Sequence, residues 1–292
     1  MKPFPHRAAF SFDIEDWHHS ELHGAHRADS ARVDESIVVR GTEAILDLLA
    51  RHGWRSTFFV LGDVVREHPA LIRRMVTEGH ELACHGMSHR PVWRATPETF
   101  RDELLEFRRV VEHALDGAFP VRGFRAPAFS IDPSNAWALD VLRAEGYAYD
   151  SSIFPMKVKL YGTPGAPVNI YRPAVSDLRR HDPNGTLVEF PVAIAEAQGL
   201  RFPAGGGFYL RALPLPVFQG MLDFILRHRP FALYLHPREV TPETRRLPLD
   251  PVNGFITYVN LHSVMAKLER LFERYEWTTM GDILESEGWL PR

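Results

Sequence analysis

Residues 57–89, TFFVLGDVVREHPALIRRMVTEGHELACHGMSH, contain the pattern that decides the fold. The apolar run STFFVL, which starts one residue earlier, predicts a strand. PALIRRMVTEG then predicts a helix that ends at Gly79, and HELACH predicts a second strand. Because a crossover helix returns the chain to the edge of the sheet that it left, the two strands are expected to be parallel.

The same alternation of strands and helices continues along the whole chain. GTEAILDLLARHG places Ile45, Leu48 and Leu49 on one helical face, while Thr96 and Pro97 predict the N-cap and first residue of a further helix. Repeated strand–helix units favour a closed arrangement over an open sheet. We therefore expect an α/β fold, a distorted (β/α) barrel of about seven parallel strands.

Composition excludes several classes of protein. The chain has 292 residues, 45% hydrophobic and 24% charged, as a packed globule requires, and its net charge of −3 gives no reason to expect a nucleic-acid partner. One cysteine allows no internal disulfide, and no apolar run approaches the ~18 residues of a membrane span or forms a signal peptide. We expect one cytoplasmic domain over residues 1–292, with a C-terminal extension at about 240–292. The sequence does not predict an oligomeric state.

Ionisable side chains follow five of the predicted strands. In a parallel barrel the C-terminal ends of the strands meet at one mouth, so groups that directly follow them are expected to converge. Such a convergence of acids, imidazoles and a guanidinium predicts an active site. The residues concerned are Asp13, Glu15, Asp16, His85, His89, Arg125, Asp150 and His236.

His85 and His89 have the spacing of a metal-binding pair. On one helical turn, side chains at i and i+4 lie about 6 Å apart on the same face, where two imidazoles can bind one divalent cation. HxxxH by itself is a weak motif, and two surface histidines explain it equally well. The intervening Gly-Met-Ser lacks the glutamate of the HExxH metalloprotease helix, which argues against that class.

Five segments together resemble the polysaccharide deacetylase family, the carbohydrate esterases with a NodB homology domain. They are SFDIEDW, the segment 57–89 that includes the HxxxH pair, RAPAF, YDSSIFP and LYLHP, and they occur in the family's order. The D-x-E-D-W variant, GGGFYLR and YVNLHSVMAKLERLFERY are similar to one subgroup, deacetylases found beside exopolysaccharide and exosortase loci. The resemblance covers nearly the whole chain.

The resemblance implies a role for each motif residue. Asp13 is the expected general base, oriented by Arg125, and His236 the expected general acid, tuned by a nearby Asp150. His85 and His89 are expected to hold a divalent cation, Zn²⁺ with Co²⁺ or Ni²⁺ as alternatives. The third ligand is left open, because the commonest family motif has two adjacent aspartates and this sequence departs from it. Glu15 has the D-x-D spacing of some relatives, whereas Asp16 is the shorter carboxylate and the residue type usual there, and we slightly favour Asp16.

Four aromatic residues are candidates for substrate binding. Trp17 and Trp93 each follow a motif, Phe129 lies within RAPAF and Tyr209 within GGGFYLR. Aromatic faces stack on sugar rings, although packing beneath a loop explains the two tryptophans about as well.

The function implied is hydrolysis of N-acetyl groups on N-acetylhexosamine units of a polysaccharide, either an exopolysaccharide or a cell-wall glycan, with the N-acetylated glycan as the only partner. One alternative is a hydrolase of a small amide, such as a ureide or a formylated sugar, on the same scaffold. A second alternative, less favoured, is a non-catalytic carbohydrate-binding protein.

Overall fold

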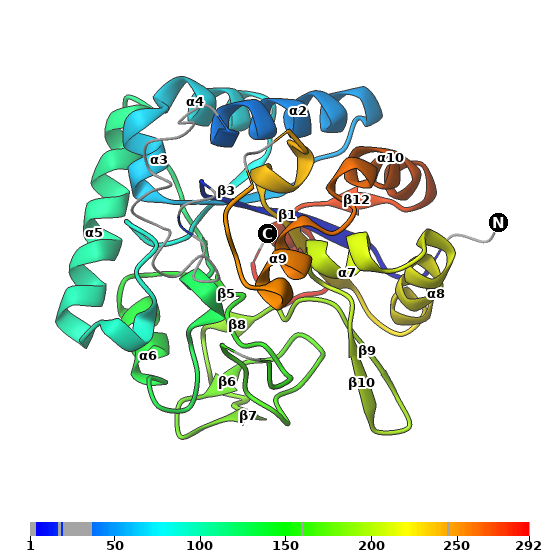
Figure 1. Ribbon diagram of the computed structural model, residues 1–292. Coiled ribbons are helices and arrows are strands. Elements are labelled where there is room, and N and C mark those ends of the chain that lie inside the picture. Colours follow the sequence, from blue (N-terminus) through cyan, green and yellow to red (C-terminus); the bar gives the residue numbers. More distant parts are fainter. Residues whose placement is uncertain (1–3, 17–18, 20–36, 159, 244–245, 292) are drawn as a thin grey trace.

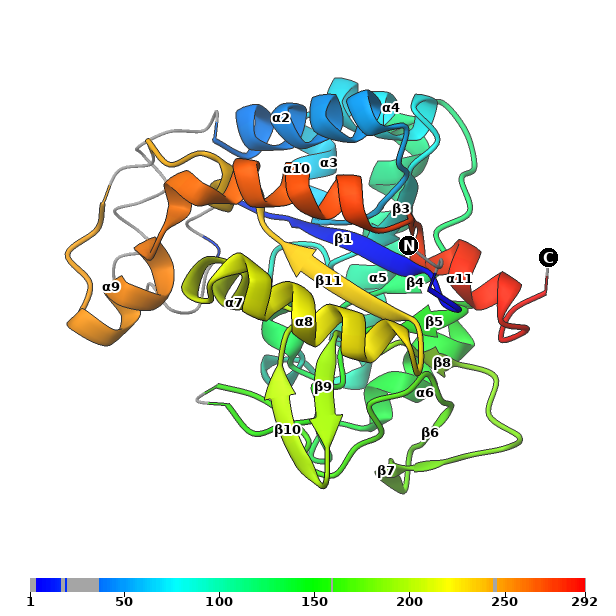
Figure 2. The same ribbon diagram turned by 90° about the vertical axis from the view of Figure 1, so that its right-hand side faces the viewer.

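A sheet of parallel strands forms the centre of the structure, a computed structural model that describes residues 4–16, 19, 37–158, 160–243 and 246–291 (Figures 1 and 2). Seven strands lie in the order β11-β1-β2-β3-β4-β5-β8, and β12 also pairs with β1. After β8 the sheet curls back, since Val192 bridges Ala232 of β11. The expected distorted barrel of about seven parallel strands is therefore confirmed. The strands are β1 (Ala8–Ile14), β2 (Thr57–Val60), β3 (Glu81–Cys84), β4 (Gly123–Phe124), β5 (Tyr149–Asp150), β8 (Val188–Glu189), β11 (Phe231–Leu235) and β12 (Trp277–Thr278).

Helices surround this sheet, and Figure 1 shows them arranged around the strands. Their amphipathic faces explain the arrangement: in α2 the expected residues Ile45, Leu48 and Leu49 are buried. The helix starting at Pro97 is capped as expected, with the Thr96 side chain accepting a hydrogen bond from the backbone N–H of Thr99. The helices are α2 (Ile37–His52), α3 (Gly62–Glu67), α4 (Pro69–Thr77), α5 (Pro97–Ala114), α6 (Trp137–Ala144), α7 (Gly207–Ala212), α8 (Leu215–Leu226), α9 (Pro251–Tyr258), α10 (Val264–Arg274) and α11 (Met280–Ser286).

Side chains of the strands alternate between two apolar cores. Every residue of β1 is buried, because helices cover one face of the strand and the barrel interior covers the other. Phe10, Phe12 and Ile14 belong to the large core under the helices, whereas Ala9 belongs to the smaller core inside the barrel. This alternation decides which side chains reach the interior at the strand ends.

Several short elements lie outside the predicted pattern. The segment 157–185 contains an antiparallel strand pair, and a hairpin precedes α7. Helix α7 begins inside the glycine-rich stretch 205–207. Among the described residues, no helix is both long enough and apolar enough to span a bilayer. The additional elements are β6 (Pro173–Ala174), β7 (Asp177–His181), β9 (Ile194–Ala197), β10 (Leu200–Pro203), η3 (Val92–Arg94), η4 (Pro127–Phe129), η5 (Pro237–Val240) and η6 (Leu261–Ser263).

Candidate metal centre and active site

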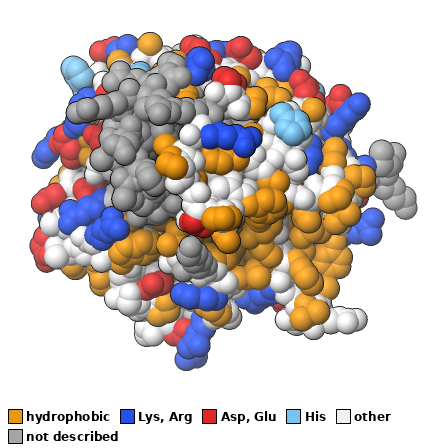
Figure 3. Space-filling view, in the orientation of Figure 1, with side chains coloured by type: hydrophobic (Ala, Val, Ile, Leu, Met, Phe, Trp, Pro, Cys, Tyr) orange, Lys and Arg blue, Asp and Glu red, His pale blue; other side chains and the backbone are white. Residues whose placement is uncertain are grey.

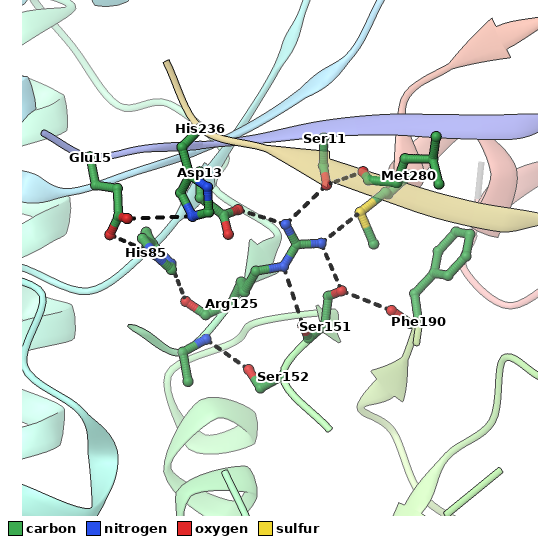
Figure 4. A network of polar contacts seen from close by, with 12 residues as sticks. Ser11, Asp13, Glu15, His85, Arg125, Ser151, Ser152, Phe190, His236 and Met280 are labelled. Carbon is green, nitrogen blue, oxygen red and sulfur yellow. Dashed lines mark hydrogen bonds and ion pairs between the residues drawn. The ribbon is translucent and has the colours of Figure 1, made fainter. Parts of the chain in front are cut away.

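Inward-facing residues at the C-terminal ends of the strands border one cavity of about 280 Å³. Asp13 and Glu15 come from the end of β1, His85 from the end of β3 and His236 from the end of β11. Figure 4 shows the carboxylates and imidazoles turned toward one another, with Arg125 behind Asp13. The convergence expected from the strand ends is therefore present for these residues.

Glu15, His85 and His89 form a group that has the donor atoms of a metal site. One ligand atom from each lies within 4.8 Å of the others, and all three residues are buried. Oε2 of Glu15 lies 2.5 Å from Nε2 of His89 and 3.9 Å from Nε2 of His85. Burial alone would raise the pKa of Glu15, but the neighbouring His89, His236 and Arg238 outweigh it and hold that pKa well below its usual value.

A hydrogen bond to the backbone orients the ring of His85 toward this group. Its Nδ1 lies 2.8 Å from the backbone carbonyl of Arg125, to which it donates, so Nε2 carries the free lone pair. Burial lowers the pKa of His85 to about 4, which favours the neutral imidazole that a metal requires.

The two histidines do not lie on a helical turn, as their spacing had suggested. Residues 85–89 form an irregular loop after β3, with positive φ at Gly86 (81°) and His89 (57°). The ring centroids of His85 and His89 are nevertheless 5.4 Å apart. Backbone turns, rather than helical periodicity, bring the pair together.

Glu15, which we had treated as the alternative ligand, occupies the place expected for Asp16. In an extended segment, residues two apart share a face, so Glu15 continues the inward series of Ser11 and Asp13. Asp16 has the opposite parity and does not belong to the group of potential metal ligands found among the described residues. Its backbone N–H donates to Nδ1 of His19 at 3.0 Å. The geometry thus corrects our preference for Asp16.

Asp13 and Arg125 form a fully buried ion pair. Nη1 of Arg125 donates to Oδ1 of Asp13 at 2.6 Å and to Oγ of Ser11 at 2.9 Å, and Nη2 donates to Oγ of Ser151 at 3.0 Å. The guanidinium also lies over the ring of Phe59, 4.0 Å from its centroid. These contacts fix the carboxylate of Asp13 at the cavity wall.

The carboxylate beside His236 is Glu239, a residue that the sequence analysis missed. Nδ1 of His236 lies 3.1 Å from Oε2 of Glu239, and Nε of Arg211 donates to Oε1 at 2.9 Å. On its other side, Nε2 of His236 lies 3.4 Å from Oε1 of Glu15. Burial by itself raises the pKa of Glu239, but Arg211 and His236 together lower it to about 2. The spacing H-P-R-E, a capping-box arrangement across η5, is the signal that we overlooked.

Asp150 does not lie where we expected it, next to His236. It pairs with Glu189 across neighbouring strands, and its carboxylate accepts a short hydrogen bond from Ser152. Burial raises the pKa of Asp150 to about 6 and that of Glu189 well above its usual value, which favours a protonated carboxyl group in this pair. Asp150 follows the inward-facing Tyr149, and its side chain therefore points away from the barrel interior.

The candidate substrate-binding residues have different positions. Phe129 and Tyr209 line the cavity, whereas Trp93 is 39% exposed and does not. Trp17 lies outside the described residues. Ala128 and Phe129 both have positive φ, in a turn whose Phe129 N–H donates to the carbonyl of Ala126 at 3.0 Å. Such strain in residues other than glycine is typical of functional sites.

Beyond the cavity, part of the same face of the molecule is an apolar patch. Figure 3 shows hydrophobic side chains gathered over α9 and the β9–β10 hairpin. The most exposed of them are Val252, Phe255, Leu200 and Phe202.

The residues present fit a divalent cation. Oε2 of Glu15 faces Nε2 of both His85 and His89, at 3.9 Å and 2.5 Å. Nδ1 of His89 is buried and makes no hydrogen bond with a described residue, although buried polar atoms normally have partners. One carboxylate and two imidazoles are a donor set typical of zinc and related metals. Fold and site together define a parallel α/β-barrel protein with a candidate metal centre at the C-terminal rim.

Comparison with known proteins matches two family models to consecutive parts of the chain. The family model "Polysaccharide deacetylase" matches residues 32–149, and residues 151–285 match a "Domain of unknown function (DUF3473)". The two matched segments meet next to Asp150, and both contribute strands to the same sheet. Residues 32–149 therefore form a polysaccharide deacetylase domain, the NodB homology domain.

The relatives are similar over part of the sequence or in fold alone. A chitooligosaccharide deacetylase of Bradyrhizobium sp. (strain ANU 289) is 41% identical over 107 residues, 37% of this chain and 46% of the relative. The chain thus matches about half the length of this curated relative. A structure from Mycobacterium smegmatis described as a polysaccharide deacetylase superposes with a TM-score of 0.66 at 20% identity, covering 100% of this chain and 94% of that one. Puue allantoinase gives 0.60 at 18% identity, covering 98% and 94%. These two structures show the shared fold.

Proposed function

We propose that this protein hydrolyses N-acetyl groups from N-acetylhexosamine units of a glycan. The observation that carries the proposal is the common cavity of Asp13, held by Arg125, and the Glu15–His85–His89 group, with His236 beside them. The deacetylase domain, and the acetylated sugars on which its named relatives act, support an amide of this class as the substrate.

We assign Glu15, His85 and His89 as the ligands of a divalent cation, Zn²⁺ in the first place. When bound, such a cation polarises a carbonyl group and lowers the pKa of water toward about 7. The neutral state of His85 and the close approach of Oε2 of Glu15 to Nε2 of His89, at 2.5 Å, support this assignment.

Asp13 accepts the proton of the water that attacks the acetyl carbonyl carbon. One carboxylate oxygen is held by Arg125 at 2.6 Å, which fixes the orientation of a side chain that lines the cavity. A positioned base of this kind contributes about 10²–10⁴-fold to the rate.

His236 donates a proton to the nitrogen of the departing sugar amine, and the C–N bond then breaks to release acetate. Glu239 accepts the Nδ1 proton of His236, which holds the ring in the orientation that directs Nε2 toward the cavity. Arg211 fixes Glu239 in turn. Two buried side chains, Glu239 and Arg211, therefore hold the proposed general acid His236 in place.

The finer assignment of the substrate is an exopolysaccharide. It is supported by the similarity of GGGFYLR and of the C-terminal segment YVNLHSVMAKLERLFERY to deacetylases beside exopolysaccharide loci. Both segments lie at or near the cavity, since Phe208 and Tyr209 line it and Lys267 donates to backbone carbonyls of α7 and the residue after it.

The test is acetate release from N-acetylglucosamine oligosaccharides and from acetylated exopolysaccharide by zinc-loaded protein. We expect the wild-type protein to release acetate, and Asp13→Asn and His236→Ala to lower the rate by about 10²-fold or more. Arg246→Gln, a charge change at an exposed position, is the matched control and should leave the rate unchanged. Equal rates for wild type and Asp13→Asn would overturn the proposal.

A further inference from the structure

Arg238 borders the cavity close to Glu15. Its side chain is 15% exposed, and Nη1 is buried and makes no hydrogen bond with a described residue. Among the described residues, the acid that forms an ion pair with it is Glu15, whose Oε1 lies 3.6 Å from Nη1, beyond hydrogen-bond distance. A buried guanidinium group in this state requires an acceptor.

The other two arginines of the site differ from Arg238 in this respect. Arg125 donates to Asp13 and to two serine hydroxyls. Arg211 donates to Glu239 and to backbone carbonyls of α9 and the residue after it. Of the three, Arg238 is the one with a buried guanidinium nitrogen, Nη1, that makes no hydrogen bond with a described residue.

The charges of the site make the same point. The charges cancel within two buried ion pairs, Asp13 with Arg125 and Glu239 with Arg211. Without a cation, Glu15 balances Arg238. The carboxylates among the described residues that line the cavity are Asp13, Glu15 and Glu239. A divalent cation on Glu15 and the two histidines would engage the one carboxylate of these three that is not already paired with Arg125 or Arg211, and Arg238 would then share its only counter-charge among them with the cation. An anion from outside the protein would restore the balance.

The backbone fixes Arg238 in this place. It lies in η5 between His236 and Glu239, and η5 packs closely on α2 at Gly41. A Cβ atom at Gly41 would lie 2.4 Å from the carbonyl oxygen of Pro237, so no larger residue allows this approach. Phe208 and Ile256 line the same cavity, and apolar neighbours strengthen an ionic contact there.

We propose that Arg238 forms an anion subsite that binds a carboxylate or phosphate substituent of the glycan, on the acetylated sugar or on its neighbour. The guanidinium group presents paired N–H donors that match either anion. The proposal rests on the proposed function for the identity of the ligand as a sugar. It makes the substrate an acidic N-acetylated glycan.

The experiment measures binding rather than turnover, by calorimetry on zinc-loaded protein that carries Asp13→Asn in every sample. One arm compares N-acetylglucosamine 6-phosphate with N-acetylglucosamine. The other compares a disaccharide of N-acetylglucosamine and glucuronate with the same disaccharide containing glucose. We expect the acidic ligand to bind about tenfold more tightly or better in at least one arm, and the arm identifies the anion.

Arg238→Gln should bring the acidic and neutral ligands of that arm within about twofold of each other, and Arg238→Lys should give an intermediate ratio. Arg246→Gln removes the same charge from an exposed position and should leave the ratio unchanged. Zinc content should not fall in Arg238→Gln, because the lost charge repels the cation, and this readout shows that the site remains folded.

The proposal is wrong if the wild-type side chain gives no preference in either arm, or if the preference survives Arg238→Gln. Failure of the proposed function is a separate result: a preference that depends on Arg238, in a protein that releases no acetate, would leave the anion subsite in place and remove the deacetylase assignment.

Discussion

Nη1 of Arg125 and Oδ1 of Asp13 lie 2.6 Å apart, in a pair whose side chains are 0% and 2% exposed. The two residues are more than a hundred positions apart in the chain and come from β1 and from the end of β4. A buried pair of this kind is weak support for stability as a whole, but removing one partner leaves an uncompensated charge. The protein retains the pair at the position where the proposed base is needed.

Arg125→Met should therefore destabilise the protein by about 3–5 kcal/mol, because the carboxylate of Asp13 remains buried without its cation. Urea unfolding measures this loss. Adding Asp13→Asn to Arg125→Met should recover part of it, since the stranded charge is then gone. A loss below about 1 kcal/mol for the single variant would show that the pair is not buried as described.

Gly207→Ala should lower kcat with little change in KM. A Cβ atom at Gly207 would lie 2.3 Å from Oε1 of Glu239, so the carboxylate that holds His236 must move. A displacement of about 1 Å in a supporting group can lower a rate by about 10²-fold. The measurement is steady-state kinetics together with zinc content, which should stay at the wild-type level.

Gly220→Ala is the matched control for that variant. Gly220 lies in α8, and a Cβ atom there meets nothing within 4 Å, so activity should not change. Equal kcat values for Gly207→Ala and Gly220→Ala would contradict the role assigned to Glu239.

Glu189→Gln should remove a pH dependence of stability. The carboxyl groups of Asp150 and Glu189 have pKa values raised by burial in the folded state, to about 6 for Asp150. The unfolded chain therefore releases protons at a lower pH than the folded one, and stability is lost as pH rises from about 4.5 through the folded pKa values. An amide at position 189 removes one titrating partner of the pair.

The measurement is the free energy of unfolding in urea at about pH 4.5 and about pH 7.5. The wild-type protein should lose stability from the lower pH to the higher pH because of this pair, and Glu189→Gln should lose less. Glu67→Gln, at an exposed position on α3, should lose as much as the wild-type protein and serves as the control. If the free energies of unfolding of the wild-type protein and Glu189→Gln differ by the same amount at both pH values, the raised pKa values of this pair are contradicted.

The sequence predicted the barrel because buried parallel strands and amphipathic helices leave strong periodic patterns. The stop of α2 before Gly53 and the start of α5 at Thr96 and Pro97 follow from backbone preferences that are local. The short strands β6, β7, β9 and β10 leave no comparable signal. They are two to five residues long, and neighbours distant in the sequence decide their pairing.

The site was predicted from the convergence of the strand ends, and strand alternation explains where that prediction and the structure differ. Ser11, Asp13 and Glu15 share the inward face of one extended segment, so the pattern favours Glu15, whereas our preference for Asp16 relied on residue type. Asp150 fails for the same reason, since it follows the inward-facing Tyr149. Glu239 and Arg211 required the tertiary structure, because they come together from η5 and α7.

Metal content should separate the two candidate carboxylates. Glu15→Gln should lower the affinity for zinc by about 10–100-fold or more, whereas Asp16→Asn should retain it. Zinc titration of the metal-free protein, followed by mass spectrometry of the dialysed sample, measures both variants side by side. The opposite ranking would restore Asp16 as the ligand.

Anomalous X-ray diffraction from a zinc-soaked crystal tests the metal centre most directly. The account predicts a single strong peak within about 2.0–2.2 Å of one oxygen of Glu15 and one ring nitrogen each of His85 and His89. A crystal whose zinc lies on Asp16, or that has no anomalous density between these three side chains, would contradict it.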